Sequence, residues 1–226
     1  FAAFGEFNCD AARITISTKM LEARWEELRT RTFLLGTFMH AMAATTWVGD
    51  AVGKAACRLL VVGDGDFSFS EAFTQSRALD TTVTTSYDTA EELNRKYGAS
   101  YVTEIVSKLV GRGVEVFHGV DATRLKETLP PSASGRPRIF ERIVFNFPHQ
   151  GGKSNIKQSR ALLIDFFASA SALLTETGEI VLTLAKGQGG TSFDVVQRQK
   201  GNSWQVVEAA ACSSFILTRC GPWVPL

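Results

Sequence analysis

Two aspartates lie inside a glycine-containing loop that follows a buried strand. The segment Arg58 to Phe73, RLLVVGDGDFSFSEAF, reads as a short apolar strand, a turn with Gly63 and Gly65, and the start of a helix. Glycines at these two positions allow a tight turn close to a ligand, as in loops that bind nucleotide cofactors. Ser68 stands where the third glycine of the dinucleotide fingerprint would be.

The negative charges of Asp64 and Asp66 discriminate between the cofactors that such a loop can bind. A dinucleotide would place its pyrophosphate over the loop, and a like charge at about 4 Å costs roughly 4 kcal/mol at an effective dielectric of about 20. S-adenosylmethionine has no phosphate; its ammonium and sulfonium are positive, and its carboxylate can meet backbone N–H groups. We therefore predict that S-adenosylmethionine is bound by Gly63, Asp64, Gly65, Asp66, Phe67 and Ser68. The alternative is that both aspartates are solvated turn formers or helix caps.

Two further acidic residues follow the next two expected strands. Asp88 ends the segment TTVTTSYD and can accept both ribose hydroxyls of an adenosine. Asp121, in the segment HGVDAT, suits a hydrogen bond to the adenine amino group. Because ligands of open α/β sheets bind beyond the carboxyl ends of the strands, both aspartates would join the glycine loop at one edge. Each aspartate can instead cap the helix that follows it.

The segment Asn146 to His149, NFPH, follows the fourth expected strand and carries groups that can hold a planar base. The Asn146 carboxamide offers a donor and an acceptor to a base edge. The Phe147 ring can stack on a base, an interaction of about 1–3 kcal/mol. Pro148 would fix the turn, and His149 can accept a proton or orient the base. The alternatives are that Phe147 fills the core and that His149 is a turn residue bonded to backbone.

A group of positive side chains follows this segment. Lys153, Lys157 and Arg160 lie within QGGKSNIKQSR, and phosphates would be natural partners for them. A helix face in contact with solvent is the alternative. These three residues are therefore candidate substrate-binding residues beside the candidate catalytic segment.

Strands and helices alternate from Arg58 onward, and this order predicts the fold. Expected strands are 58–62, 81–88, 114–122, 141–147, 179–185 and 215–220, and expected helices are 67–78, 89–113, 159–178 and 203–213. Thr89 and Glu92 form a capping-box pattern, and Gly178 would end the third helix. The alternation predicts an α/β fold with a mostly parallel, doubly wound sheet.

Composition excludes several classes of protein. The 226 residues, 45% hydrophobic and 21% charged, suffice for one sizeable core, and a net charge of +1 argues neither for nor against nucleic acid. The four cysteines form no CxxC pair and there are three histidines, so we expect reduced thiols in an intracellular protein and no metal site. The apolar run 33–48 is short and interrupted by polar residues, so no membrane span is expected.

Residues 1–57 differ in pattern from the rest of the chain. Charges at helical spacing in 17–35 predict a helix that Ser17 or Thr18 can cap, and residues 49–54 read as a linker. We expect an amino-terminal extension at 1–57, helical or poorly ordered, before one domain at 58–226. Because the chain stops before a seventh strand could form, this domain is predicted to be truncated at its carboxyl end and to lack its last strand.

Several segments together resemble one known family. LLVVGDGDFSFSEAF, TTSYDTAEEL, GVDATRL, IVFNFPHQGGK and TLAKGQGGT…NSWQVVEAA are similar to the Rossmann-like domain of the large-subunit rRNA (uridine-N3)-methyltransferases, over about residues 58–211. GQGGT and NSWQVV resemble the animal subgroup that carries a C-terminal ferredoxin-fold anticodon-binding domain. The resemblance implies a class I methyltransferase fold, S-adenosylmethionine as methyl donor, ribosomal RNA as substrate, and a nucleolar or nuclear location, with the cytoplasm as the alternative. NFPH is similar to the signature of Asn, Asp or Ser followed by Pro-Pro and an aromatic residue, found in methyltransferases that modify nitrogen in planar bases, which implies that it is the catalytic segment.

Three functions are compatible with these residues. In an rRNA (uridine-N3)-methyltransferase, a uridine splayed out of the RNA would be oriented by Asn146 and the Phe147–Pro148 main chain, and His149 or water would take its N3 proton. A non-catalytic Rossmann-like module that binds RNA or protein is the alternative, because fold does not fix function. An NAD-dependent oxidoreductase is disfavoured by the two loop aspartates and the missing third glycine. The sequence does not indicate the oligomeric state.

Overall fold

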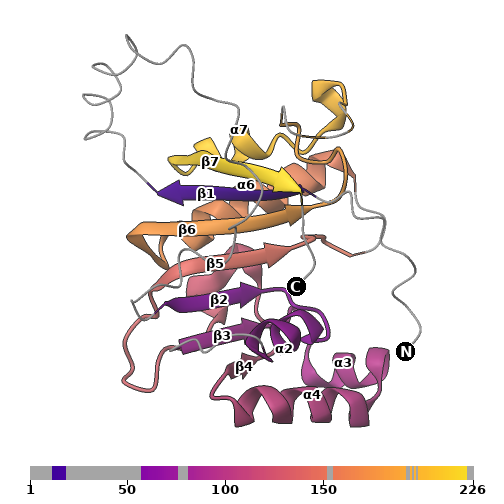
Figure 1. Cartoon of the computed structure of the whole chain (residues 1–226), viewed down its shortest axis with the longest axis vertical. Helices are drawn as coiled ribbons and strands as arrows, with labels where there is room; N and C mark the ends of the chain where they lie inside the picture. Colours follow the sequence, from indigo (N-terminus) through magenta and orange to yellow (C-terminus); the bar gives the residue numbers. More distant parts are fainter. Residues whose placement is uncertain are drawn as a thin grey trace.

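A seven-stranded mixed sheet organises the chain. The computed structural model describes residues 12–18, 57–75, 81–151, 155–191, 194, 196 and 198–222. The strands are β1 (Ala12–Thr18), β2 (Arg58–Val62), β3 (Thr81–Thr85), β4 (Glu115–Phe117), β5 (Phe140–Asn146), β6 (Leu174–Leu184) and β7 (Phe215–Pro222). The helices are α2 (Ser68–Gln75), α3 (Ala90–Tyr97), α4 (Ala99–Gly111), α5 (Leu125–Thr128), α6 (Ile156–Ser171), α7 (Val206–Ala211) and the short 3-10 turns η1 (Ala122–Arg124) and η2 (Lys200–Asn202). The strand order β4-β3-β2-β5-β6-β1-β7 can be followed from bottom to top in Figure 1.

The strands from β4 to β6 form a parallel sheet with helices on both faces. β2 pairs in parallel with β3 and β5, β3 with β4, and β5 with β6. On one face Phe145 of β5 packs edge-on against Phe166 of α6, with ring centroids 4.9 Å apart. On the other face Leu59 and Val61 of β2 cluster with Phe73 of α2. The predicted mostly parallel, doubly wound Rossmann-like sheet is confirmed, and burial on both faces explains the continuous apolar run of β2.

The amino-terminal strand β1 lies antiparallel between β6 and β7. Ile14 and Ile16 are fully buried in the core, and burying each contributes about 1.5–3 kcal/mol. Residues 12–18 therefore form part of the sheet, where an extension that is helical or poorly ordered was expected. Ser17 and Thr18, the expected helix caps, end this strand, whereas the expected linker 49–54 lies outside the described residues.

The expectation of a sheet without its last strand is also wrong. The described chain has no strand after β7, but β1 supplies the seventh strand from the other end of the sequence. It pairs with β6 along six residues and with β7 along seven, so both facing edges are satisfied. The segment was missed because its alternation of apolar and polar residues is short, and because its partners are more than 150 residues away in sequence.

The first long helical segment is divided at a glycine. The Thr89 side chain accepts a hydrogen bond from Glu92 N at 3.2 Å, and Thr89 N donates to the Glu92 carboxylate at 2.9 Å, so the predicted capping box is confirmed. The single helix expected over 89–113 is instead two helices, α3 and α4, that meet at Gly98. Gly98 has a φ of +92°, which no helical residue adopts. The chain therefore turns between them, and α3 and α4 lie at the β4 end of the sheet in Figure 1.

The third expected helix, α6, ends earlier than its sequence suggests. α6 ends at Ser171, and Gly178 lies inside β6 rather than at the end of a helix. Leu174 pairs with Phe140 of β5, so strand pairing begins where the sequence still has helical spacing. A Cβ on Gly178 would come within 2.8 Å of Leu174 Cδ2, which explains the glycine at this irregular part of the strand.

Ion pairs secure the amino ends of the parallel strands. Arg58 of β2 binds Glu141 of β5, and Arg138 holds Glu115 of β4 with two hydrogen bonds of 2.6 and 2.7 Å.

Among the described helices, none has the length and apolar character needed to cross a membrane. The same part of the chain contains no group of three or more His, Cys, Asp or Glu side chains arranged to hold a metal ion.

Candidate functional site

The loops that follow β2, β3 and β4 are joined by hydrogen bonds. Asp64 N donates to Thr85 O at 2.8 Å, and Ser86 Oγ donates to Gly65 O at 3.2 Å. Val120 N donates to Ser86 O at 3.0 Å, which adds the loop after β4. The structure therefore brings together the glycine loop and the segments that carry the two acidic residues expected at the ends of β3 and β4.

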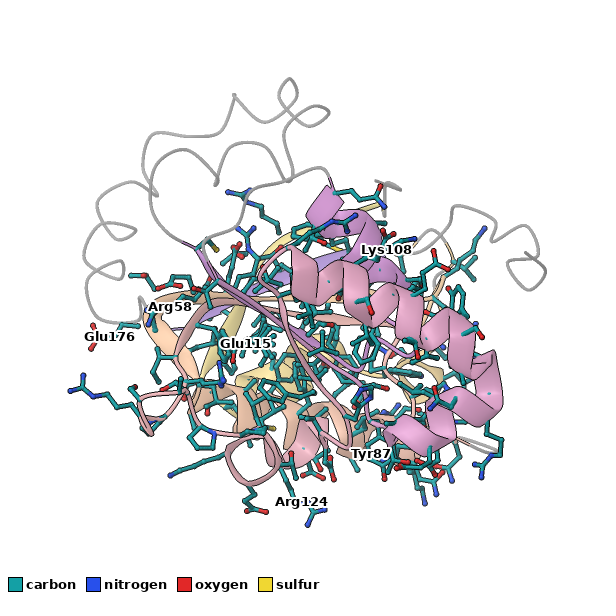
Figure 2. All side chains as sticks on the ribbon, turned by 90° about the horizontal axis from the view of Figure 1, so that it is seen from below. Arg58, Tyr87, Lys108, Glu115, Arg124 and Glu176 are labelled. Carbon is teal, nitrogen blue, oxygen red and sulfur yellow. The ribbon has the colours of Figure 1, made fainter. Side chains whose placement is uncertain are left out.

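The NFPH segment leaves the sheet beside the glycine loop. Val62 of β2 pairs with Phe145 of β5, so the residues that follow these two strands are lateral neighbours. Figure 2 shows Tyr87, which follows β3, at the opposite end of the strands from Arg58, which begins β2. The candidate cofactor-binding and catalytic segments thus share the carboxyl edge of the parallel sheet, as the sequence predicts for this fold.

Gly63 and Phe67 give the glycine loop its shape. Gly63 has a φ of +64°, and a Cβ at this position would lie 2.8 Å from Phe145 Cε2, so a side chain cannot be accommodated. Phe67 also has a φ of +64°, and its fully buried ring packs edge-on against His118 with centroids 5.3 Å apart. Phe67 therefore anchors the loop in the core, and its side chain is not at the surface where a ligand would bind.

Asp64 and Asp66 cap the helix α2. Asp64 Oδ2 accepts a hydrogen bond from Ser70 N at 2.8 Å. Asp66 Oδ1 accepts from Ser68 N at 3.1 Å and from Ser68 Oγ at 2.6 Å, and Asp66 Oδ2 accepts from Tyr101 Oη at 3.2 Å. Both carboxylates satisfy N–H groups at the positive end of the helix dipole. The capping role that the sequence left open is the one that the structure displays for both residues.

Asp64 is held in an environment that disfavours its charge. Burial raises the pKa of its carboxyl from 3.8 to about 6, although the hydrogen bonds from Ser70 act in the opposite direction. The neighbouring charge of Asp66 adds to the rise. A carboxylate with a raised pKa beside a second carboxylate gains most from a cation placed near it, which is the charge that S-adenosylmethionine carries.

Asp88 and Asp121 already have partners in the chain. Both carboxylate oxygens of Asp88 accept hydrogen bonds from Lys96 Nζ, at 2.7 and 2.6 Å. Asp121 caps η1, accepting from Thr123 N at 2.8 Å and from Arg124 Nε at 3.3 Å. The ion pair with Lys96 leaves the Asp88 side chain partly exposed. Its carboxylate oxygens can therefore also accept hydrogen bonds from the hydroxyls of a ribose. For Asp121 the structure therefore shows the helix-capping role that the sequence offered as the alternative to adenine binding.

The residues of this edge fit S-adenosylmethionine. The backbone N–H groups of Gly65 and Asp66 form no hydrogen bond with any described residue, so they are available to a carboxylate. Gly65 is exposed, and a Cβ there would approach Tyr97 Oη at 3.4 Å, so the glycine keeps the loop tip open. The loop thus offers N–H donors to the carboxylate of S-adenosylmethionine. The nearby loop aspartates suit the ammonium of the cofactor, and Asp88 suits its ribose hydroxyls.

Asn146 and Phe147 are fixed by a threonine of the neighbouring strand. Thr183 Oγ1 donates to Asn146 Oδ1 at 2.7 Å, and Phe147 N donates to Thr183 O at 2.8 Å. Phe147 has a φ of +49°, a conformation that costs of order 1–3 kcal/mol for a residue with a side chain, and it is 43% exposed. Phe147 therefore does not fill the core, and the buried Pro148 follows it in the turn.

His149 has a defined orientation next to this turn. Gly151 N donates to His149 Nδ1 at 3.0 Å, so Nδ1 is the acceptor and the neutral ring carries its hydrogen on Nε2. The imidazole is exposed. In this orientation His149 can donate a hydrogen bond from Nε2, while its Nδ1 already accepts one from Gly151.

Only part of the predicted positive group of Lys153, Lys157 and Arg160 is available to bind a phosphate. Lys157 is exposed at the start of α6 and makes no ion pair with the described residues. Arg160 instead binds the backbone of the η2 loop, through Nε to Ser203 O at 3.0 Å and through Nη2 to Gly201 O at 3.0 Å. Lys153 lies outside the described residues. Of the two that the structure describes, Lys157 is the one that faces solvent.

Sequence reasoning missed three residues that the structure brings to this edge. Thr183 lies opposite Asn146 in the β5–β6 pair, and only the strand register reveals it. Tyr97 and Tyr101 lie on α3 and α4, and both approach the glycine loop. With Tyr87 they are all three tyrosines of the chain, and this clustering within 15 residues was a signal present in the sequence.

Comparison with known proteins gives one family and several relatives. A family model described as BMT5-like, rRNA (uridine-N3-)-methyltransferase BTM5-like, matches residues 60–224. The chain is 42% identical over 166 residues to the ferredoxin-fold anticodon-binding domain-containing protein 1 homolog of Mus musculus, covering 74% of this chain and 26% of that protein. It is 39% identical over 167 residues to the Homo sapiens protein of that name, again covering 74% of this chain and 26% of the relative. The chain thus spans about a quarter of the length of these curated relatives.

Two solved structures are similar at a lower level. The pyocyanin biosynthetic protein PhzM has a TM-score of 0.39 and 12% identity, covering 70% of this chain and 39% of that one. Streptomyces venezuelae DesVI has a TM-score of 0.37 and 17% identity, covering 65% of this chain and 52% of that one. Because both scores are low, the fold assignment rests on the strand order and pairing of this chain.

Proposed function

Because the chain belongs to the rRNA (uridine-N3-)-methyltransferase BTM5-like family, we propose that it is an S-adenosylmethionine-dependent enzyme that methylates N3 of a uridine in large-subunit ribosomal RNA. The family and the Rossmann-like sheet support an RNA methyltransferase in general. The uridine, the large-subunit rRNA, the cofactor, and a nucleolar or nuclear location are the finer parts of this proposal.

One observation carries the proposal most directly, namely the conformation of Phe147. Its backbone is in the left-handed region, its ring is 43% exposed, and its N–H is held by Thr183 at the edge shared with the glycine loop. A strained and exposed aromatic residue next to a carboxamide is costly to keep for stability alone. It suits a base that is splayed from the RNA and stacked on the ring.

Each residue of the NFPH segment would have a different role in binding the base. Phe147 stacks on the uracil, while the Asn146 carboxamide donates to its edge. Pro148 has a fixed φ and keeps the turn in one conformation, so the ring and carboxamide remain aligned. Lys157 can hold a phosphate of the same strand. Catalysis then comes mainly from positioning the N3 atom.

The proton on N3 must leave, because this nitrogen carries it within an imide. His149 donates from Nε2 while Gly151 occupies Nδ1, so His149 is suited to orienting a uracil carbonyl oxygen. Of the two acceptors that the sequence left open, we favour a water molecule as the acceptor of the N3 proton, because the Gly151 N–H occupies His149 Nδ1. The negative charge that develops on the carbonyl oxygens is stabilised by the donors on Asn146 and His149.

The cofactor would be held by the glycine loop and by Asp88. Bound there, S-adenosylmethionine supplies an electrophilic methyl group. Gly65 N and Asp66 N would meet its carboxylate, the Asp66 side chain its ammonium, and Asp88 the ribose hydroxyls. The Asp64 carboxylate adds negative potential behind the loop.

The test uses the full chain, deuterium-methylated S-adenosylmethionine, and RNA from cells that lack the protein. Nucleoside mass spectrometry should detect labelled 3-methyluridine. Phe147→Gly should lower its yield by about 5–150-fold, which corresponds to the loss of stacking worth about 1–3 kcal/mol. The matched variant Phe147→Tyr keeps the ring and should retain most of the activity.

Folding and cofactor binding separate the possible failures. Glycine relieves the backbone strain at position 147 but loses the packing of the partly buried ring, so these two effects oppose each other. Phe147→Gly should therefore remain folded, with a free energy of unfolding within about 1–3 kcal/mol of the wild type, and bind S-adenosylmethionine equally well in calorimetry. A well-folded wild type that binds no S-adenosylmethionine would refute the enzyme and favour the non-catalytic RNA- or protein-binding module. Equal methylation by Phe147→Gly would refute the role of the ring.

A further inference from the structure

Asn146 and Thr183 form a cross-strand pair in which the threonine hydroxyl donates a hydrogen bond to the asparagine carboxamide. The two residues are register partners in the parallel β5–β6 pair, so their side chains lie on the same face of the sheet. Thr183 is fully buried, and its Oγ1 donates to Asn146 Oδ1 at 2.7 Å. The carboxamide oxygen of Asn146 is therefore turned toward β6.

The buried hydroxyl sets which end of the carboxamide faces the base. Asn146 Oδ1 is the one acceptor that the Thr183 hydroxyl has among the described residues. If the carboxamide turned over, its Nδ2 would donate to Thr183 Oγ1, but the hydroxyl hydrogen would then have no acceptor among the described residues at a buried position. An unsatisfied buried donor disfavours that orientation by on the order of tenfold. Asn146 Nδ2 makes no hydrogen bond with any described residue, so its N–H groups remain available.

We propose that Thr183 determines the base specificity of the site by fixing the Asn146 carboxamide with its N–H donors toward the substrate. The proposal rests on the proposed function and extends it to the choice of base. The fixed donor matches O4 of uracil, which is an acceptor. Cytosine carries an amino group at the same place, and this group would face a second donor.

Thr183 is a positioning residue in this proposal, because it does not touch the base. Its hydroxyl acts through Asn146, whereas its backbone carbonyl holds Phe147 N and is unaffected by a change of side chain. Thr183→Val keeps the shape and the β-branch but removes the hydroxyl. The carboxamide can then turn over and present its oxygen to the amino group of cytosine, so discrimination between the two bases should fall.

Two other variants isolate the effect of the hydroxyl. Thr183→Ser keeps the hydroxyl and should keep the specificity. Thr82→Val removes a hydroxyl from another buried strand residue, whose Oγ1 has no hydrogen-bond partner in the described part of the chain, and should leave specificity unchanged. All three variants change a buried strand threonine, so a general loss of packing would affect them alike.

The first measurement does not depend on methyl transfer. Uridine 5′-monophosphate and cytidine 5′-monophosphate are titrated into protein with ¹⁵N-labelled asparagine, and the Asn146 side-chain resonance is assigned by its loss in Asn146→Ala. In the wild type, Thr183→Ser and Thr82→Val, the uridine nucleotide should bind about tenfold more tightly than the cytidine nucleotide. In Thr183→Val the two nucleotides should bind within about threefold of each other.

The second measurement compares products in the RNA assay. Thr183→Val should raise the ratio of labelled 3-methylcytidine to 3-methyluridine by about tenfold, while Thr183→Ser should not. Unchanged nucleotide selectivity in Thr183→Val, or no shift of the Asn146 resonance with either nucleotide in the wild type, would overturn the proposal. Selective nucleotide binding without any methylated product would instead support the Thr183 role and refute the proposed function.

Discussion

Asp64→Asn is expected to stabilise the folded chain at neutral pH and to weaken cofactor binding. The Asp64 carboxylate is partly buried behind the glycine loop and accepts from Ser70 N at 2.8 Å, a bond that an asparagine oxygen can also accept. Burial raises its pKa to about 6, so the negative charge is unfavourable in the folded state. Asparagine has a similar shape and removes that charge.

The magnitude follows from the two pKa values. A carboxyl with a pKa of about 6 when folded and 3.8 when unfolded makes the folded state less stable by about 3 kcal/mol above pH 6. Because the folded pKa is the higher one, the stabilising contribution of the protonated form is complete below 3.8 and is lost as pH rises through about 6. The advantage of Asp64→Asn should therefore be up to about 3 kcal/mol at pH 7.5 and about 1 kcal/mol at pH 4.5.

Urea unfolding of both proteins at several pH values between 4.5 and 7.5 measures this difference, and acid effects common to both proteins cancel. Asp121→Asn is a matched control of opposite sign. Burial alone would raise the pKa of Asp121, but hydrogen bonds from Thr123 and the charge of Arg124 outweigh it and lower the pKa. Asp121→Asn should therefore destabilise the chain at neutral pH, with a cost that shrinks as pH falls through the lowered pKa.

Two results would refute this reasoning. If Asp64→Asn were less stable than the wild type at pH 7.5, the carboxylate would be contributing more through its bond to Ser70 than burial removes. If its advantage were the same at all pH values, the pKa of Asp64 would not be raised. Calorimetry with S-adenosylmethionine at pH 7.5 completes the test, because the cationic cofactor should bind more weakly without the Asp64 charge.

Two further perturbations test the strand β1 and the glycine loop. Ile14→Ala and Ile16→Ala should each lower the free energy of unfolding by about 2–5 kcal/mol in urea, because both side chains are fully buried; a loss below about 0.5 kcal/mol would mean that residues 12–18 lie outside the fold. Gly63→Ala should lower both stability and S-adenosylmethionine affinity, because its Cβ would lie 2.8 Å from Phe145 Cε2 and its φ is +64°. Gly98→Ala, at φ +92° with no atom near its Cβ, is the control: it should lose stability by about 1 kcal/mol or more and keep the affinity.

Local patterns in the sequence were sufficient for most of the parallel sheet. The apolar run 58–62, the glycines after it, and the capping box of Thr89 and Glu92 depend on residues within a few positions of each other, and all were confirmed. The order of strands and helices predicted the sheet and its carboxyl edge, because parallel strands require crossover connections. The NFPH segment was placed correctly at the end of β5 for the same reason.

The sequence by itself thus determined the parallel strands and which loops meet at their carboxyl ends, because strand periodicity, turn glycines and helix caps are local properties. Only the tertiary structure decided that β1 fills the sheet between β6 and β7, and that Asn146 faces Thr183. It also decided that Phe147 is exposed and held by Thr183 of the neighbouring strand. These features depend on pairing and packing between distant segments, and a one-residue change of register would turn the strand side chains of β1 and of Asn146 to the opposite face of the sheet.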